Sequence, residues 1–102
     1  MTRERLANRR ASETFSFECG GLRFTATVSR YGDGRVGEVF LENHKASSFA
    51  GIMASDAAIA ASLALQFGCP AEVLRKALSR DSRGNESSPL GATLDLLVER
   101  EG

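Results

Sequence analysis

The stretch FSFECGGLRFTATV, residues 15–28, decides the fold, because apolar and polar residues alternate on both sides of a glycine pair. Alternation with a period of two is typical of a half-buried β-strand, since successive side chains point to opposite faces of a sheet. Gly20 and Gly21 interrupt the alternation, and two glycines fit a two-residue hairpin loop that needs positive φ angles. The stretch therefore predicts two antiparallel strands joined by a tight turn.

A third strand is predicted after this hairpin. The Asp33-Gly34 step is a strong signal for a second hairpin turn. Residues 36–41 follow it and are apolar on both faces, with Val39 on one side and Phe40 on the other. We expect a three-stranded antiparallel meander from about residue 14 to residue 41. Because so short a chain has little material to cover both faces, we also expect a homodimer or another oligomer.

From residue 47 onward the apolar spacing changes to that of helices. A long helix is predicted to begin at Ser48 or at Ser55, since Gly51 permits either start. Gly68 suits the left-handed position after its last turn. The residues of this helix that fall near one face, as in an amphipathic helix, are Ile52, Ile59, Leu63 and Gln66/Phe67.

Two shorter helices are predicted after Gly68. Pro70 suits the first position of one of them, and Ser88 followed by Pro89 is an N-cap and first-turn proline that opens the other. Residues 79–88 form an exposed loop between the two helices. The predicted fold class is therefore α+β, a three-stranded antiparallel β-meander followed by and packed against about three α-helices.

Length and composition match one ordinary globular domain. The chain has 102 residues, of which 42% are hydrophobic and 25% charged, so it has room for one core. The longest apolar stretch, residues 57–67, falls short of the roughly 20 residues that span a bilayer. In a signal peptide an apolar segment follows the basic residues, and no such segment follows the arginines near the N-terminus. We expect a cytoplasmic protein that does not enter a membrane.

The charges balance over the chain but not along it. Basic and acidic residues number thirteen each, whereas the first ten residues hold four arginines and one glutamate. Such a basic terminus is either solvated or a contact for phosphate or nucleic acid. We expect a flexible basic arm at residues 1–12, one α+β domain at residues 13–99 and a frayed end at residues 100–102.

Nucleophiles and metal ligands are too few for a recognisable catalytic centre. Cys19 and Cys69 lie fifty residues apart, and His44 is the only histidine. The four ligands of a structural zinc site are therefore missing. Neither cysteine has a nucleophile signature around it, although a Cys–His pair stays open as an alternative. We expect no catalytic residue, no metal ligand and no cofactor in this chain.

Hydroxyls and cations in the predicted loops indicate a site for an anionic ligand, either a nucleotide or phosphate. The candidate residues are Arg35, Lys45, Ser47, Ser48 and Ser88. Hydroxyls and helix amides donate hydrogen bonds to an anion, and Lys or Arg supplies the compensating charge. The alternative interpretation is structural, in which the same residues only cap helices, flank a turn and connect two elements.

The order of several short motifs resembles that of a known family. The motifs are GGLRFTATV at 20–28, DGRV at 33–36, EVFL at 38–41, DAA at 56–58, SLALQ at 62–66, LRKAL at 74–78 and SPLGA at 88–92. In this order and spacing, residues 9–97 resemble the TSCPD-domain family. That family is similar to a C-terminal region of vitamin B12-dependent ribonucleotide reductases and also occurs as small stand-alone proteins.

The resemblance implies a non-catalytic nucleotide-binding, regulatory or subunit-interaction module linked to deoxyribonucleotide synthesis. The implied partners are a ribonucleotide reductase subunit or a second copy of the chain. Of the motif that names the family only Cys69-Pro70 is present, and the active-site cysteines and cobalamin site of the reductase have no counterpart. Because these residues are missing, we expect that the isolated chain is not an enzyme. The alternative is a nucleic-acid-binding module that uses the arginine-rich N-terminal arm.

Overall fold

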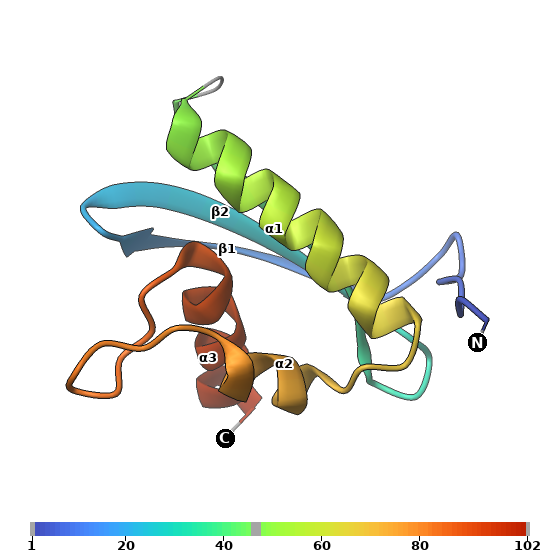
Figure 1. Ribbon diagram of the computed structural model, residues 1–102. Coiled ribbons are helices and arrows are strands. Elements are labelled where there is room, and N and C mark those ends of the chain that lie inside the picture. Colours follow the sequence, from blue (N-terminus) through green and yellow to red (C-terminus); the bar gives the residue numbers. More distant parts are fainter. Residues whose placement is uncertain (1, 46–47, 102) are drawn as a thin grey trace.

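Figure 1 shows the computed structural model of the chain, which describes residues 2–45 and 48–101. Three strands precede three helices: β1 (Ser12–Cys19), β2 (Leu22–Arg30), β3 (Val36–Asn43), α1 (Phe49–Gln66), α2 (Ala71–Ala77) and α3 (Pro89–Glu101). The strands form one antiparallel sheet in the order β1-β2-β3. The predicted α+β fold, a meander packed against three helices, is confirmed.

Both turns of the meander depend on glycine. Gly20 and Gly21 join β1 to β2 with φ angles of 61° and 78°, so the predicted two-residue hairpin is confirmed. The β2–β3 turn is longer and spans residues 31–35. Within it Gly34 has a φ of 94°, and the Asp33 carboxylate accepts a hydrogen bond from a backbone N–H of the turn at 3.1 Å. A side chain thus stabilises the longer turn, as is common for aspartate.

The two faces of the sheet differ in what covers them. One face packs against α1 and α3 and contributes the buried core side chains Phe24, Ala26, Val28, Val39 and Leu41. On the other face, hydroxyl pairs connect β1 to β2, including Thr14–Thr27 and Ser16–Thr25 at 3.1 Å each. Phe40 pairs with Thr27 and is 51% exposed on this face. The third strand is therefore buried on one face only, although it is apolar on both.

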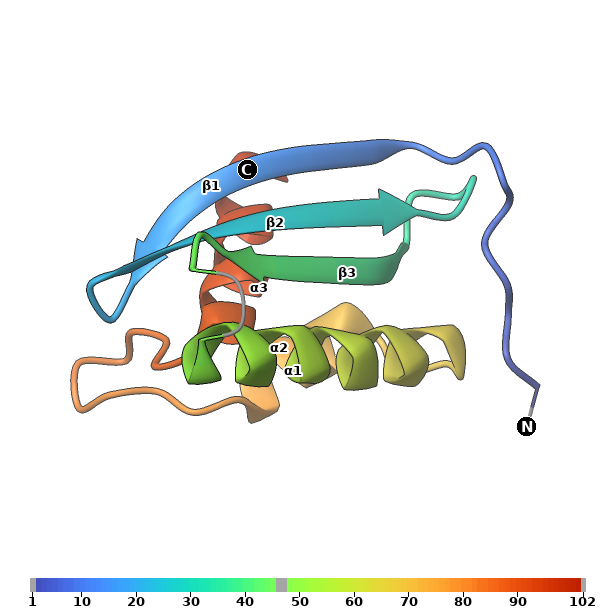
Figure 2. The same ribbon diagram turned by 90° about the horizontal axis from the view of Figure 1, so that it is seen from above.

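Helix α1 lies along β3, as Figure 2 shows, and bonds to the outer edge of that strand. The Ser62 hydroxyl accepts a hydrogen bond from the Val39 N–H at 2.9 Å and donates one to the Val39 carbonyl at 3.1 Å. The Gln66 side-chain amide donates to the Gly37 carbonyl at 2.9 Å. Unpaired backbone groups at a sheet edge are a template for another strand. Two buried side chains of α1 satisfy these groups instead.

The side of α1 that faces the sheet is built mainly from small residues, because larger ones would hold the helix away from the strand edge. Its buried residues are Ala54, Ala58, Ala61, Ser62, Leu65 and Gln66. Of the residues expected near one face from the apolar spacing, Gln66 packs against the sheet, whereas Ile52 and Ile59 point away from it and are 50% and 52% exposed. Reading that face as the packed side of the helix is therefore wrong.

Helix α1 is also longer than the apolar stretch expected at residues 57–67. By length and composition alone its 18 residues are long and apolar enough to cross a membrane. The core helix of a soluble protein passes the same test, and α1 makes hydrogen bonds to β3 through Ser62 and Gln66. The described residues form a compact unit with a radius of gyration of 13.2 Å. This packing is consistent with a soluble protein.

Candidate functional site

The predicted ligand-binding residues lie in separate places. Ser47 is outside the described residues. Arg35 precedes β3 and Lys45 follows it, so these two cations lie at opposite ends of the strand (Figure 2). Arg35, Lys45 and Ser88 line different pockets. The structure therefore does not bring the described candidates together into one site.

Both described serines of the prediction act as helix caps. The Ser48 hydroxyl accepts a hydrogen bond from the Gly51 N–H at 3.0 Å and donates one to the Asn43 side chain at 3.2 Å. The Ser88 hydroxyl accepts a hydrogen bond from the Gly91 N–H at 3.1 Å. Each cap occupies one of the helix amides that an anion would bind. The geometry of these two serines is therefore that of residues that cap helices.

Arg35 is bound to carboxylates of its own chain. Its guanidinium donates hydrogen bonds to Glu4 at 2.9 and 3.0 Å and to Asp33 at 2.7 Å. It also lies over the Tyr31 ring, 4.6 Å from the ring centroid. Hydrogen bonds from the Arg35 backbone and side chain lower the pKa of Asp33. Arg35 thus connects the N-terminal segment to the β2–β3 turn.

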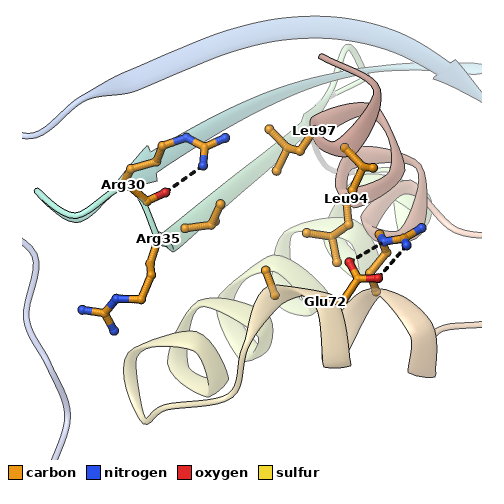
Figure 3. Close-up of a pocket in the computed structure, with 10 residues that line it drawn as sticks. Arg30, Arg35, Glu72, Leu94 and Leu97 are labelled. Atoms are coloured by element: carbon orange, nitrogen blue, oxygen red, sulfur yellow. Dashed lines mark hydrogen bonds and ion pairs between the residues drawn. The ribbon is translucent and has the colours of Figure 1, made fainter. Parts of the chain in front are cut away.

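A pocket of about 260 Å³ lies between this turn and helices α2 and α3 (Figure 3). Leu94 and Leu97 of α3 form part of its apolar lining, and Arg30 donates a hydrogen bond to the Gly34 carbonyl at 2.9 Å. Arg35 points away from the pocket (Figure 3). Glu72 on the opposite side of the pocket forms an ion pair with Arg75. This pair neutralises the positive charge of Arg75, so the pocket offers an anion little uncompensated positive charge.

A cluster of ion pairs beside this pocket connects α2 and the loop after it to α3. Asp95 of α3 accepts hydrogen bonds from Arg75 at 3.0 Å and from Arg80 at 2.8 Å. The hydrogen bonds from Arg80 and Arg75 hold the pKa of Asp95 well below its usual range. Since the Asp95 side chain is 20% exposed, solvent screens the cluster only in part.

The Asp95 cluster makes stability dependent on pH. A carboxylate whose pKa is lower in the folded state adds stability above the unfolded pKa of about 3.9, and this contribution disappears as pH falls. We expect Asp95→Asn to lower the free energy of unfolding by about 1 kcal/mol at neutral pH. The difference from the wild type should shrink below about pH 4. Urea unfolding at several pH values, with Glu99→Gln as control, measures it; a difference independent of pH would contradict this role.

No disulfide or hydrogen bond connects Cys19, Cys69 and His44 among the contacts of the described residues. Cys19 and Cys69 are both free, and the His44 ring lies 3.4 Å from the Thr25 hydroxyl. Burial, with a smaller contribution from Glu86, raises the pKa of the Cys19 thiol, which makes a thiol less reactive. Within residues 2–45 and 48–101, no group of three or more His, Cys, Asp or Glu side chains is arranged to hold a metal ion.

Exposed apolar side chains gather on α1 and its C-cap, where the apolar spacing had suggested a packed face. This outer face of α1 consists of Phe49, Ile52, Met53, Ile59, Leu63 and Phe67, which are between 39% and 78% exposed. The helical period of 3.6 residues places them along one side of the helix. Contiguous exposed apolar surface of this kind marks interaction sites in soluble proteins. The sequence pattern therefore located an apolar face correctly but not its role.

An apolar groove of about 430 Å³ extends the outer face at the start of α1. It lies between α1, the β1–β2 hairpin and the start of α3, and Phe49 and Met53 belong to both surfaces. Leu22 and Leu78 add further apolar lining, whereas Ser88 contributes a hydroxyl that already caps α3. The chemistry of this region favours an apolar partner over a phosphate group.

Comparison with known proteins gives one consistent match. The TSCPD domain matches residues 2–98 of this chain. The chain is 41% identical over 70 residues to a vitamin B12-dependent ribonucleotide reductase of Agrobacterium fabrum, covering 69% of this chain and 6% of that protein. For the reductases of Rhodopirellula baltica and Streptantibioticus cattleyicolor the identities are 39% over 72 and 40% over 70 residues, covering 71% and 69% of this chain.

The chain spans only a small part of these relatives, 7% of the Rhodopirellula protein and 12% of the Streptantibioticus protein. No solved structure gives a significant match. The similarity therefore concerns the domain described above and not the remainder of those longer proteins.

Proposed function

The chain belongs to the TSCPD domain family, and we propose that it is a non-catalytic module that binds a ribonucleotide reductase subunit in the cytoplasm. In this role it serves deoxyribonucleotide synthesis without reducing ribonucleotides itself. Radical chemistry of that kind needs a cofactor that forms the radical and cysteines that supply electrons. The half-buried Cys19 thiol, with its raised pKa, is poorly suited to supply electrons.

The outer face of α1 is the observation that carries the proposal. In the reductases that this chain resembles, the matching segment belongs to the same polypeptide as the rest of the enzyme. A domain that packs against a larger body needs an exposed apolar surface, and Phe49 and Ile52 provide one at 78% and 50% exposure. Asp56 is the charged residue on the outer face of α1, and it adds a contact for a basic side chain of the partner.

Charged substitutions on this face test the proposal. We expect Ile59→Glu combined with Leu63→Glu to weaken binding to a purified B12-dependent reductase at least tenfold, because two carboxylates would enter the contact. Val73→Glu combined with Val98→Glu is the matched control, since these two exposed apolar residues lie on α2 and α3. Its affinity should stay within twofold of the wild type. Surface plasmon resonance with the intact chain measures all three proteins.

Two outcomes would contradict reductase binding by this face. One is that the wild-type chain does not bind the reductase at all. The other is that the paired substitutions convert a dimer of this chain into a monomer in sedimentation while reductase binding is unchanged. The second result would assign the outer face to a second copy of the chain.

A further inference from the structure

A second hollow lies between the N-terminal segment and the β2–β3 turn. Figure 2 shows this segment running past the end of the sheet beside that turn. The hollow, called here the arm cleft, has a volume of about 570 Å³ and is lined by residues from 4–11 and 30–35. This volume falls within the range of about 300–1,000 Å³ that small-molecule sites occupy.

Hydrogen bonds at Glu4 hold the segment in place. The Tyr31 hydroxyl donates to the Glu4 carbonyl at 2.6 Å, and the Glu4 N–H donates to the Gln66 carbonyl at 2.7 Å. The Glu4 carboxylate binds Arg35, as described above. At its other end the segment continues into β1. Because both ends are attached to the domain, the cleft is part of the folded structure.

Arginine dominates the charge of the arm cleft. Its lining includes Arg5, Arg9, Arg10, Arg30 and Arg35. Arg10 pairs with Glu38 at 2.9 Å and Arg30 with Glu13 at 3.6 Å, and Arg35 is bound as described. The side chains of Arg5 and Arg9, by contrast, are exposed and make no hydrogen bond or ion pair with the described part of the chain. These two guanidinium groups are therefore available to an anion.

The number of available charges indicates the size of that anion. A phosphate monoester carries about −1.5 to −2 at neutral pH, which two guanidinium groups offset. Arginine binds phosphate through two parallel N–H···O contacts, so Arg5 and Arg9 suit phosphate oxygens in geometry as well as charge. Gly32 and Gly34 in the wall of the cleft have open space where a Cβ would be, which allows close approach of a ligand.

We propose that the arm cleft binds the phosphate groups of a free nucleotide, with Arg5 and Arg9 as the direct contacts. A nucleic acid would share the phosphate chemistry but needs an extended basic surface. The chain as a whole has a formal net charge of zero. The local excess of positive charge in its first ten residues lies beside this cleft. A ligand the size of a nucleotide matches that distribution. This inference goes beyond reductase binding and does not depend on it.

Titration calorimetry of the intact chain tests the proposal with AMP, inorganic phosphate and adenosine as probes. We expect AMP and inorganic phosphate to bind and adenosine not to bind. Arg5→Gln combined with Arg9→Gln should weaken both interactions at least tenfold. The matched control is Arg23→Gln combined with Arg83→Gln, which removes the same charge from exposed positions outside the cleft and should change affinity less than twofold.

Four results would overturn the proposal. They are absence of binding at millimolar AMP and phosphate, equal loss in both pairs of variants, tighter binding of single-stranded DNA than of AMP, and phosphate-induced amide shifts that avoid residues 31–35. Equal loss would show diffuse electrostatic attraction, and preference for DNA would assign the arm to nucleic acid. Circular dichroism of each variant verifies that these exposed substitutions leave the fold intact.

Discussion

Phe24→Ala is expected to lower the free energy of unfolding by about 3–5 kcal/mol. Phe24 is 1% exposed in β2, and its ring stacks on that of Phe17 with 5.9 Å between the centroids. Truncation removes this buried surface and leaves a cavity between the sheet and the helices. Because small domains have total stabilities of only about 5–15 kcal/mol, the loss is a large fraction of the whole. Urea unfolding followed by circular dichroism measures it.

Leu22→Ala is the matched control for this core position. Leu22 lies two residues earlier on the same face of β2 but is 37% exposed, so we expect a loss of only about 1 kcal/mol. If Phe24→Ala does not fold, Phe24→Leu gives a graded value that should still exceed the control. Equal losses at residues 22 and 24 would contradict the burial described for this sheet.

Ser62→Ala is expected to cost about 2–4 kcal/mol, more than the loss of an ordinary hydroxyl. The Ser62 hydroxyl bonds both the N–H and the carbonyl of Val39, and Ser62 is 8% exposed. Alanine would leave two backbone groups without a partner beneath α1. Each buried group without a hydrogen bond costs about 1–3 kcal/mol.

Urea unfolding tests this role of Ser62. The Ser55→Ala substitution is the control, because Ser55 is half-buried on the same helix, and we expect a change within about 0.5 kcal/mol. Identical stability of the two variants would show that α1 does not protect the edge of β3.

The meander was predictable because its signals are local. Alternation over residues 15–28 and the pair Gly20-Gly21 specify strand and turn with no reference to the rest of the chain. The cap at Ser88 was predictable for the same reason, since Ser88 bonds an amide three residues ahead. Ser48 bonds an amide in the same way, but the sequence left it open as one of two possible starts of the long helix. The length of the second turn was not, because the Asp33-Gly34 step alone does not distinguish a two-residue loop from a longer one.

The orientation of α1 depends on a contact that no local pattern contains. The helix approaches the edge of β3 through alanines and through Ser62 and Gln66, whose partners lie 23 and 29 residues earlier. A search for large apolar residues therefore selects the opposite side of the helix. A run of small residues broken by Ser62 and Gln66 was the available signal for close packing with hydrogen bonds.

The candidate anion site was only partly accessible from the sequence. Arg35 and the arginine-rich arm were both identified, but as parts of two competing hypotheses. Their proximity results from the contacts of Glu4 with Arg35 and Gln66, which are 31 and 62 residues away in sequence. The spacing of residues along the chain does not indicate such contacts, so the cleft could not be predicted from the sequence.

The hydrogen bonds from α1 to β3 also limit how far copies of this domain can assemble through their sheets. Helix α1 covers β3 at one edge of the sheet, so another strand can be added only at β1, the other edge. Two copies joined along β1 would present only covered edges to a third. Growth by this route therefore terminates at a pair, and open-ended fibre formation is suppressed by the fold itself.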